Sequence, residues 1–199
     1  MDRTRREFLA AAGAVGLAGC AGADSGEAAT TAPAATGKDA DSGGATTTTA
    51  PPPEWLGAEL TDVTTGETFT VAGLAADRPV LLATFAIWCG ICTSQQHALA
   101  HFRSEHPGRA AVVSLNVDPN ERRAAVVEHA EAHGFDWRFV VAPPGVSHSL
   151  SSAFGPSMLH PPSAPVAVVC RPDRTAASVV GSDGLIKGTD TLLSAVEGC

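Results

Sequence analysis

The sequence predicts one α/β domain in which a mixed central sheet is flanked by helices and preceded by a β-hairpin. Apolar, β-compatible runs alternate with helix-compatible runs along residues 54–199, an order that is typical of α/β proteins. The last two predicted strands follow one another across a short turn, so part of the sheet should be antiparallel. This length is sufficient for a single hydrophobic core.

Each element is predicted from the spacing of its apolar residues and from the turn-forming residues at its ends. A hairpin at residues 60–71 and a connection at residues 74–78 come first. Strands are then expected at residues 80–86, 110–117, 137–141, 166–170 and 176–181. Helices are expected at residues 93–106, 118–133, 147–154 and 189–197.

Prolines and glycines set several of these boundaries. Pro107 and Gly108 end the first helix, and Gly134 ends the second, because glycine closes a helix easily and proline cannot continue one. The prolines and glycine at residues 143–145 are expected to break the chain before the third helix. A proline-rich loop at residues 155–165 then leads into the next strand.

The most informative motif is the run from Trp88 through Cys89 and Gly90 to Cys92, where a buried strand gives way to a helix. Unpaired N–H groups and the helix dipole favour a thiolate at a helix N-terminus. A zinc site would need two further ligands at short spacing, and the chain has no second Cys-x-x-Cys. We therefore predict a redox-active pair. An exposed Cys89 would attack a partner's disulfide, and Cys92 would resolve the mixed disulfide.

With this order of elements, the Trp-Cys-Gly-x-Cys motif resembles the thioredoxin superfamily, and within it the membrane-tethered, extracytoplasmic TlpA/ResA-like branch. The resemblance covers roughly residues 54–199. It implies a thioredoxin-like fold and a thiol–disulfide oxidoreductase that needs no cofactor besides its disulfide. It also implies a cis-proline at Pro165, substrate pairing through the backbone of Ala164, and an apolar wall at Trp88. The alternative is a trans Pro165 that only starts the strand.

Two positions depart from the family pattern. Ile91 stands where the family often has proline, so the direction of the reaction cannot be read from the residues between the cysteines. Ala83 stands where many relatives carry a buried acid that moves a proton to the inner sulfur. Glu67 or another acid of the hairpin could replace it.

Residues 113–119 and 135–139 are also similar to Sco proteins, copper carriers of respiratory oxidase assembly that share the fold. This second resemblance implies Cu(I) bound by Cys89, Cys92 and His160, because thiolate and imidazole ligands suit Cu(I). Against it, Sco proteins place three residues between their cysteines, and Ser163 occupies the position of the Sco histidine. A third possibility is a non-enzymatic binding module whose cysteines are inert.

Residues 1–20 are typical of an export signal. Arg5 and Arg6 precede a short apolar run that ends in small residues before Cys20. The run is too short to span a bilayer as a helix. It resembles a twin-arginine signal with a lipoprotein box, which implies cleavage before Cys20 and a lipid on its sulfur. An ordinary cleaved signal is the alternative.

Residues 21–53 are rich in Ala, Thr, Gly, Ser, Asp and Pro, and are expected to be a disordered tether. The formal net charge of −8 argues against a nucleic-acid partner. The whole pattern implies a protein anchored by lipid to the outer face of the cytoplasmic membrane. Its partners would be exported Cys-containing proteins, such as apocytochromes, oxidase subunits or copper chaperones, and a membrane or extracytoplasmic thiol donor.

Two cysteines and two pairs of histidines have no assigned role. Cys170 and Cys199 could form a disulfide outside the cytoplasm, or could be a small core residue and a frayed terminus, since connectivity cannot be deduced from sequence. Histidines stand four apart on the first and second predicted helices. Such spacing can hold a metal, but a solvated helix face is its commoner origin. These residues are His97 with His101, and His129 with His133.

Overall fold

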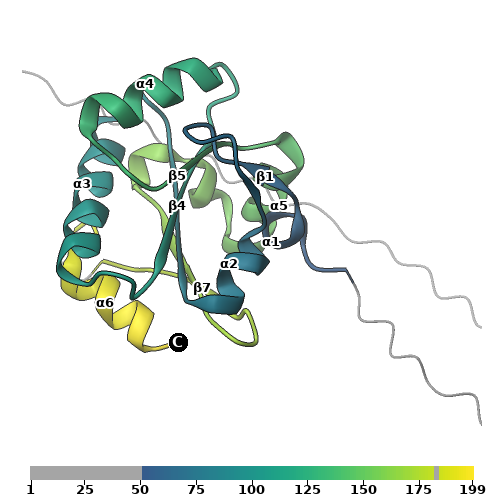
Figure 1. Ribbon diagram of the computed structural model, residues 1–199, viewed down its shortest axis with the longest axis vertical. Coiled ribbons are helices and arrows are strands. Elements are labelled where there is room, and N and C mark those ends of the chain that lie inside the picture. Colours follow the sequence, from purple (N-terminus) through teal and green to yellow (C-terminus); the bar gives the residue numbers. More distant parts are fainter. Residues whose placement is uncertain (1–50, 182–183) are drawn as a thin grey trace, which may run out of the picture. The chain divides into compact units, whose positions relative to one another are not determined.

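In the computed structural model, a five-stranded mixed sheet separates two layers of helices (Figure 1). The structure describes residues 51–181 and 184–199. The predicted signal at residues 1–20, its Cys20, and the predicted tether up to residue 50 lie outside the described residues. Within the described ranges, no helix is both long enough and apolar enough to cross a membrane.

The sheet has the strand order β5-β4-β3-β6-β7, and β1 and β2 form a separate antiparallel pair. The central strand β3 runs parallel to β4 and antiparallel to β6, which confirms the predicted mixed sheet and N-terminal hairpin. The strands are β1 (Leu60–Thr61), β2 (Thr68–Phe69), β3 (Val80–Phe85), β4 (Ala111–Asn116), β5 (Arg138–Val141), β6 (Val166–Val169) and β7 (Ala176–Ser178). The helices are α1 (Glu54–Gly57), α2 (Val71–Asp77), α3 (Gly90–Glu105), α4 (Arg123–His133), α5 (Pro144–Phe154), the short 3-10 helices η1 (Pro156–Leu159) and η2 (Pro161–Ser163), and α6 (Thr189–Glu197).

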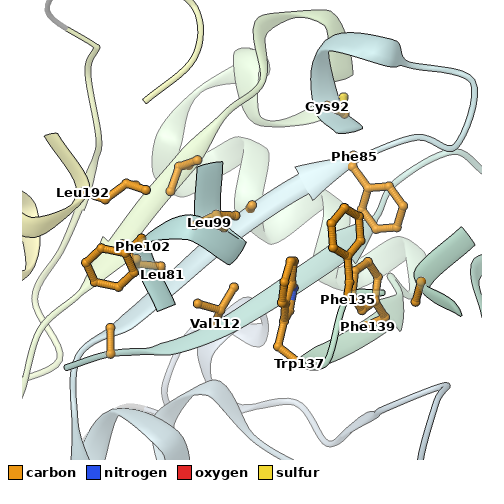
Figure 2. Close-up of a cluster of buried hydrophobic side chains, with 14 of the residues drawn as sticks. Leu81, Phe85, Cys92, Leu99, Phe102, Val112, Phe135, Trp137, Phe139 and Leu192 are labelled. Carbon is orange, nitrogen blue, oxygen red and sulfur yellow. The ribbon is translucent and has the colours of Figure 1, made fainter. Parts of the chain in front are cut away.

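Both faces of the central strand β3 are buried, as its continuous apolar run predicts. Successive side chains of a strand point to opposite faces, so Leu81 and Phe85 join one hydrophobic cluster while Leu82 joins the other. The first cluster includes residues of α3, α4 and α6, among them Leu99 and Leu192 (Figure 2). The second includes residues of α1, α2 and α5. The site-bearing helix α3 is therefore anchored along its length by the core.

Three helix boundaries differ from the prediction, each for a local reason. Residues 74–77 of the expected connection belong to α2, because the Thr70 hydroxyl accepts a hydrogen bond from the Gly73 N–H at 2.9 Å and caps a helix there. The helix α4 begins at Arg123 rather than residue 118, because the Asp118 carboxylate bonds Asn120 N–H at 2.9 Å in a turn. Residues 143–145 do not break the chain: α5 starts there with proline in its first turn.

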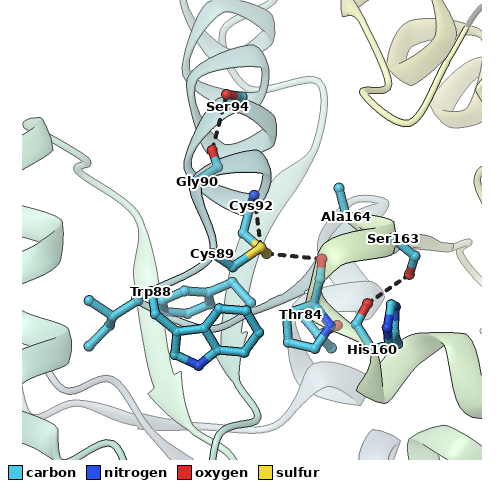
Figure 3. Close-up of a disulfide and its surroundings, with 12 residues drawn as sticks. Thr84, Trp88, Cys89, Gly90, Cys92, Ser94, His160, Ser163 and Ala164 are labelled. Carbon is cyan, nitrogen blue, oxygen red and sulfur yellow. Dashed lines mark hydrogen bonds between the residues drawn. A yellow bond between two sulfur atoms is a disulfide. The ribbon is translucent and has the colours of Figure 1, made fainter. Parts of the chain in front are cut away.

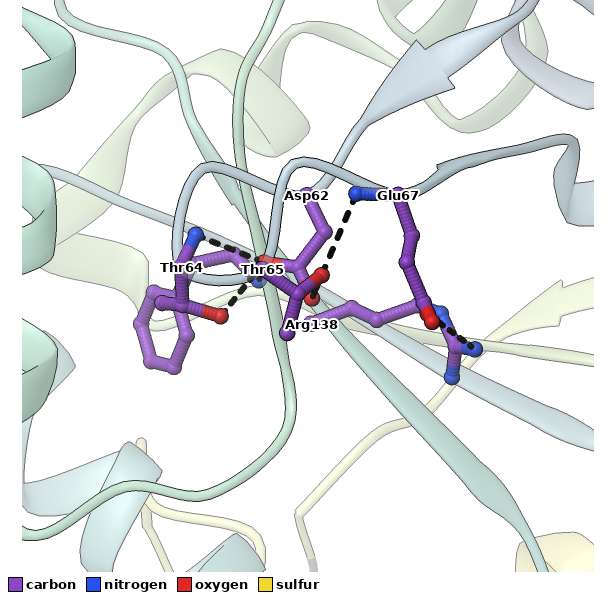
Figure 4. Close-up of polar contacts among 6 residues, drawn as sticks. Asp62, Thr64, Thr65, Glu67 and Arg138 are labelled. Atoms are coloured by element: carbon purple, nitrogen blue, oxygen red, sulfur yellow. Dashed lines mark hydrogen bonds and ion pairs between the residues drawn. The ribbon is translucent and has the colours of Figure 1, made fainter.

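The hairpin is held against β5 by a buried acid, Asp62 (Figure 4). Its carboxylate accepts hydrogen bonds from Thr64 N–H at 3.0 Å and from the hydroxyl groups of Thr64 and Thr65 at 2.7 and 3.1 Å. It also accepts a longer bond, 3.4 Å, from the Phe139 N–H of β5. Glu67, at the end of the same turn, lies 3.8 Å from the Arg138 guanidinium. The hairpin acids are thus engaged with β5.

A second disulfide joins Cys170, just after β6, to Cys199, just after α6. Of the two alternatives left open by the sequence, the structure has the bridge. The two Cα atoms are 4.9 Å apart and the cysteines are 29 positions apart in the chain. The bridge therefore ties the C-terminal helix to the sheet and closes a loop that includes β7 and α6.

His129 is buried, which corrects the expectation that its helix face is solvated. Its side chain enters the space between α4 and β3, where the ring stacks on Phe85 with 5.4 Å between centroids. Its Nε2 is 2.8 Å from the Oε1 atom of Gln96 on α3. Burial, helped by the nearby charges of His133 and His97, lowers the pKa of His129 from 6.5 to about 4. His97, His101 and His133 remain exposed.

Replacing both bridge cysteines, Cys170→Ser with Cys199→Ser, should lower the free energy of unfolding by roughly 2–4 kcal/mol, because the unfolded chain gains conformational freedom when a loop of this size is opened. Urea denaturation followed by circular dichroism measures the change. With a reductant present throughout, wild type and variant should unfold at the same urea concentration, because the bridge is then absent from both. A difference that persists under reduction would show that the serines act in some other way.

The fold should lose stability in acid partly through His129. Because its folded-state pKa is depressed to about 4, the unfolded chain binds more protons between pH 6.5 and 4. The contribution of the neutral, buried His129 to the free energy of unfolding is therefore fully present above pH 6.5. It is lost as the pH falls toward 4, by up to about 3 kcal/mol. Denaturation of His129→Gln at pH 7 and pH 4.5 should show a smaller acid loss than wild type. The exposed His148→Gln serves as control, and an equal loss in all three proteins would contradict this role.

Candidate redox site at the N-terminus of α3

The predicted redox pair forms a disulfide where the chain passes from β3 to α3 (Figure 3). Cys89 is the N-cap residue of the 16-residue helix α3, and Cys92 lies in its first turn. The Sγ atom of Cys89 accepts a hydrogen bond from the backbone N–H of Cys92 at 3.2 Å. The sulfur thus takes the place of the oxygen that a capping Ser or Asp would provide.

The two sulfurs have different electrostatic surroundings. Cys89 Sγ lies at the positive end of the helix dipole and faces an N–H donor, both of which favour a thiolate. Cys92 Sγ lies 3.0 Å from the carbonyl oxygen of Pro161, which can accept a hydrogen bond from a thiol but repels a thiolate. In the reduced protein, Cys89 is therefore the sulfur that ionises more readily.

Cys89 is not exposed as predicted: it is 3% exposed and Cys92 is 2% exposed. The sulfurs turn inward toward the helix N-terminus, and η2 packs against α3 on the side of Cys92. The residues on either side of Cys89 are nevertheless open. Trp88 is 63% exposed, and a Cβ atom added at Gly90 would meet no atom within 4 Å. The Cys89 sulfur therefore lies directly beneath the surface, between two exposed residues.

The expected cis-proline at Pro165 is wrong, because the chain turns here through Ala164 instead. Among the residues described, the cis peptide bond is Arg171–Pro172. Ala164 adopts a left-handed conformation, with φ of 44° and ψ of 55°. Its N–H donates to Pro161 O at 2.7 Å, and its carbonyl accepts from Lys187 Nζ at 2.7 Å. In this structure the Ala164 backbone is thus internally bonded and not free to pair with a substrate chain.

Two acids that the sequence analysis did not single out hold the loop before Cys89. Both oxygens of Glu121 accept from Ile87 N–H at 2.9 Å, and Asp118 accepts from the Trp88 indole at 2.6 Å. Hydrogen bonds from the Asn120 backbone and from Trp88 lower the pKa of Asp118. Both acids follow β4, which is parallel to β3. Since parallel strands end at the same sheet edge, residues after β4 could have been expected beside the motif.

Many relatives carry a buried acid at the position of Ala83. The hairpin does not place a carboxylate beside the sulfurs to replace it. Glu67 forms an ion pair with Arg138. In the sheet register, Arg138 of β5 pairs with Val113 of β4, and Val113 pairs with Leu82 of β3. This position is three residues before the strand end from which the site is built. Within the described ranges, the carboxylates bound to the loop before Cys89 are those of Glu121 and Asp118, and Glu121 also accepts from the Asn116 side chain.

The structure does not assemble the alternative copper site. His160 is exposed between η1 and η2, and its carbonyl accepts a hydrogen bond from the Ser163 hydroxyl at 2.8 Å. The neighbour of Cys92 Sγ on this segment is the Pro161 carbonyl rather than an imidazole. No group of three or more His, Cys, Asp or Glu side chains in the described part of the chain is placed to hold a metal ion.

Comparison with known proteins places the chain in a family. The Redoxin family matches residues 27–187, so the chain belongs to the Redoxin family. It is 38% identical over 61 residues to a thioredoxin of Streptomyces clavuligerus, covering 31% of this chain and 56% of the relative. It is 31% identical over 133 residues to the bifunctional thioredoxin reductase/thioredoxin of Mycobacterium leprae, covering 62% of this chain and 28% of that one. The chain therefore spans about half of the first relative's length and less of the second.

Solved structures confirm the thioredoxin-like fold. A secreted disulfide oxidoreductase of Mycobacterium tuberculosis, described as homologous to E. coli DsbE, has a TM-score of 0.54 at 18% identity, covering 73% of this chain and 98% of that one. The structure of MTB dsbF has a TM-score of 0.55 at 18% identity, covering 73% of this chain and 97% of that one. A putative electron transfer protein of Aquifex aeolicus VF5 has a TM-score of 0.55 at 18% identity, covering 70% and 90%.

The different surroundings of the two sulfurs should be visible in their reactivity. After reduction, a short pulse of iodoacetamide at mildly acidic pH should label Cys89 well before Cys92, because the thiolate is the reacting species and only Cys89 has groups that stabilise it. Peptide mass mapping separates these labels from those on Cys170 and Cys199. Faster labelling of Cys92 would contradict the assignment.

Proposed function

We propose that this protein is an extracytoplasmic thiol–disulfide oxidoreductase that exchanges disulfides with exported Cys-containing proteins. One observation carries the proposal: the Cys89–Cys92 disulfide lies at the N-terminus of α3, with Cys89 Sγ capping the helix and Cys92 Sγ facing a carbonyl oxygen. One sulfur is thereby prepared to attack, and its neighbour stays protonated until it is needed. Membership of the Redoxin family and the thioredoxin-like fold support this reading.

The reaction follows from this asymmetry. The Cys89 thiolate attacks one sulfur of a partner's disulfide, the partner's S–S bond breaks, and its second sulfur leaves as a thiolate that takes up a proton. Cys92 then loses its proton and attacks Cys89 Sγ, which releases the first sulfur of the partner. Two electrons have passed from the Cys89–Cys92 dithiol to the partner. The reverse sequence oxidises a partner's dithiol.

A partner would approach over Trp88 and Gly90. Trp88 offers a flat apolar surface, fixed by its indole bond to Asp118 and still 63% exposed, and the space beside Gly90 is open. Substrate pairing through Ala164 and Pro165 remains a proposal. It requires the internal hydrogen bonds of Ala164 to be exchanged for bonds to the partner.

The proposed location is the outer face of the cytoplasmic membrane. It rests on the motifs of residues 1–20, which resemble a twin-arginine signal with lipidation at Cys20, and on the tether composition of residues 21–53. We place the protein in the TlpA/ResA-like branch because of its Trp-Cys-Gly-x-Cys motif and its order of elements. A thiol donor of the membrane or the extracytoplasmic space would keep the pair reduced if the protein acts as a reductase. Apocytochromes, oxidase subunits and copper chaperones are the proposed partners.

Turnover of a model disulfide tests the function. With dithiothreitol as donor, the wild-type protein should accelerate the reduction of insulin, while Cys89→Ser should lower the rate to that of dithiothreitol alone, because no attacking sulfur remains. The variant with Cys170→Ser and Cys199→Ser is the matched control and should keep the wild-type rate. A wild-type rate equal to the background, from protein with native circular dichroism, would support the inert binding module instead.

A further inference from the structure

Lys187 is a buried lysine whose charged end is directed to the segment that covers Cys92. It is one of two lysines in the chain and is 6% exposed. Its Nζ donates hydrogen bonds to the carbonyl oxygens of Ala164 at 2.7 Å, Leu185 at 2.8 Å and Ser163 at 3.3 Å. Burial lowers the pKa of this ammonium, and hydrogen bonds from a charged donor are stronger in such surroundings than in water.

The backbone of Lys187 is fixed to the helix that carries the disulfide. Its N–H donates to the Oε1 atom of Gln95 at 2.7 Å, and the Nε2 atom of Gln95 donates to its carbonyl at 3.0 Å. Gln95 is 2% exposed and lies three residues after Cys92 on α3. Lys187 therefore joins α3 to the turn at Ala164.

These contacts form a closed ring of interactions that begins and ends on α3, at Cys92 and Gln95. From Cys92 Sγ the path crosses to Pro161 O at 3.0 Å, and from there to Ala164 N at 2.7 Å. It continues from Ala164 O to Lys187, and returns through Gln95 to α3. Ala164 is left-handed, a conformation that is sterically unfavourable for a residue with a Cβ atom. The Lys187 ammonium holds the carbonyl of this residue and so opposes its return to an ordinary conformation.

We propose that Lys187 is a positioning residue for the redox pair, which keeps the turn from Pro161 to Ala164 closed over Cys92. This role rests on the proposed function and deepens it. With the turn closed, the Pro161 carbonyl accepts a hydrogen bond from the Cys92 thiol in the reduced protein, and η2 shields that sulfur from solvent and from foreign disulfides. Of the two sulfurs of the pair, Cys89 is then the one offered to a partner, while Cys92 is kept for the second step.

The test compares the labelling of the two cysteines in reduced protein. In Lys187→Met, the ratio of Cys92 to Cys89 labelling by a pulse of iodoacetamide should rise about tenfold, the size of effect expected from losing a hydrogen bond to a charged group. Arg109→Met is the matched control: it removes an exposed cation that pairs with Glu197 at 2.7 Å, and should leave the ratio unchanged. Adding Ala164→Gly to Lys187→Met should bring the ratio back toward wild type, because glycine adopts the left-handed conformation without help.

A merely structural role for Lys187 would lower the melting temperature without changing this ratio. A folded Lys187→Met protein with the wild-type ratio would therefore overturn the proposal. If Lys187→Met lacks native circular dichroism, Gln95→Ala decides, since it frees Lys187 from α3: a raised ratio supports the proposal and an unchanged one overturns it. Equal labelling of Cys89 and Cys92 in wild type would instead contradict the proposed function itself, so the two failures are distinguishable.

Discussion

The redox site depends on one interaction, the capping of α3 by the sulfur of Cys89. The hydrogen bond from Cys92 N–H to Cys89 Sγ, 3.2 Å long, places the Cys89 sulfur at the positive end of the longest helix among the described residues. That helix is fixed by Leu99 and Phe102, both fully buried against the sheet. The core thus determines where the sulfur lies, and the helix end determines how readily it ionises.

The rest of the site limits what this sulfur can reach. Acids after β4 hold the loop before it, Glu121 through Ile87 N–H and Asp118 through the Trp88 indole. On the other side, the turn ending at Ala164 covers Cys92. The pair is therefore nearly buried, yet it is bordered by the exposed Trp88. Such an arrangement suits a sulfur that meets a disulfide presented by a docked partner rather than every disulfide in solution.

Much of this could be predicted from the sequence, because the relevant signals are local. The buried strand, the helix after it and the cysteine spacing located the disulfide correctly. What the sequence could not show depends on contacts between distant segments. The carbonyl of Pro161 next to Cys92 is 69 positions away, and the bonds between Gln95 and Lys187 span 92. The sequence left Pro165 open between a cis and a trans bond, and the structure has the trans bond, beside a left-handed Ala164 whose carbonyl is held by Lys187.

Trapping of the mixed disulfide tests the central claim most directly. Reduced Cys92→Ser and Cys89→Ser proteins, each also carrying Cys170→Ser and Cys199→Ser, are mixed with a disulfide-containing model protein and analysed by mass spectrometry. The account predicts a stable mixed disulfide through Cys89 in the first protein and little adduct through Cys92 in the second. Adducts that form equally fast through either cysteine, or faster through Cys92, would contradict it.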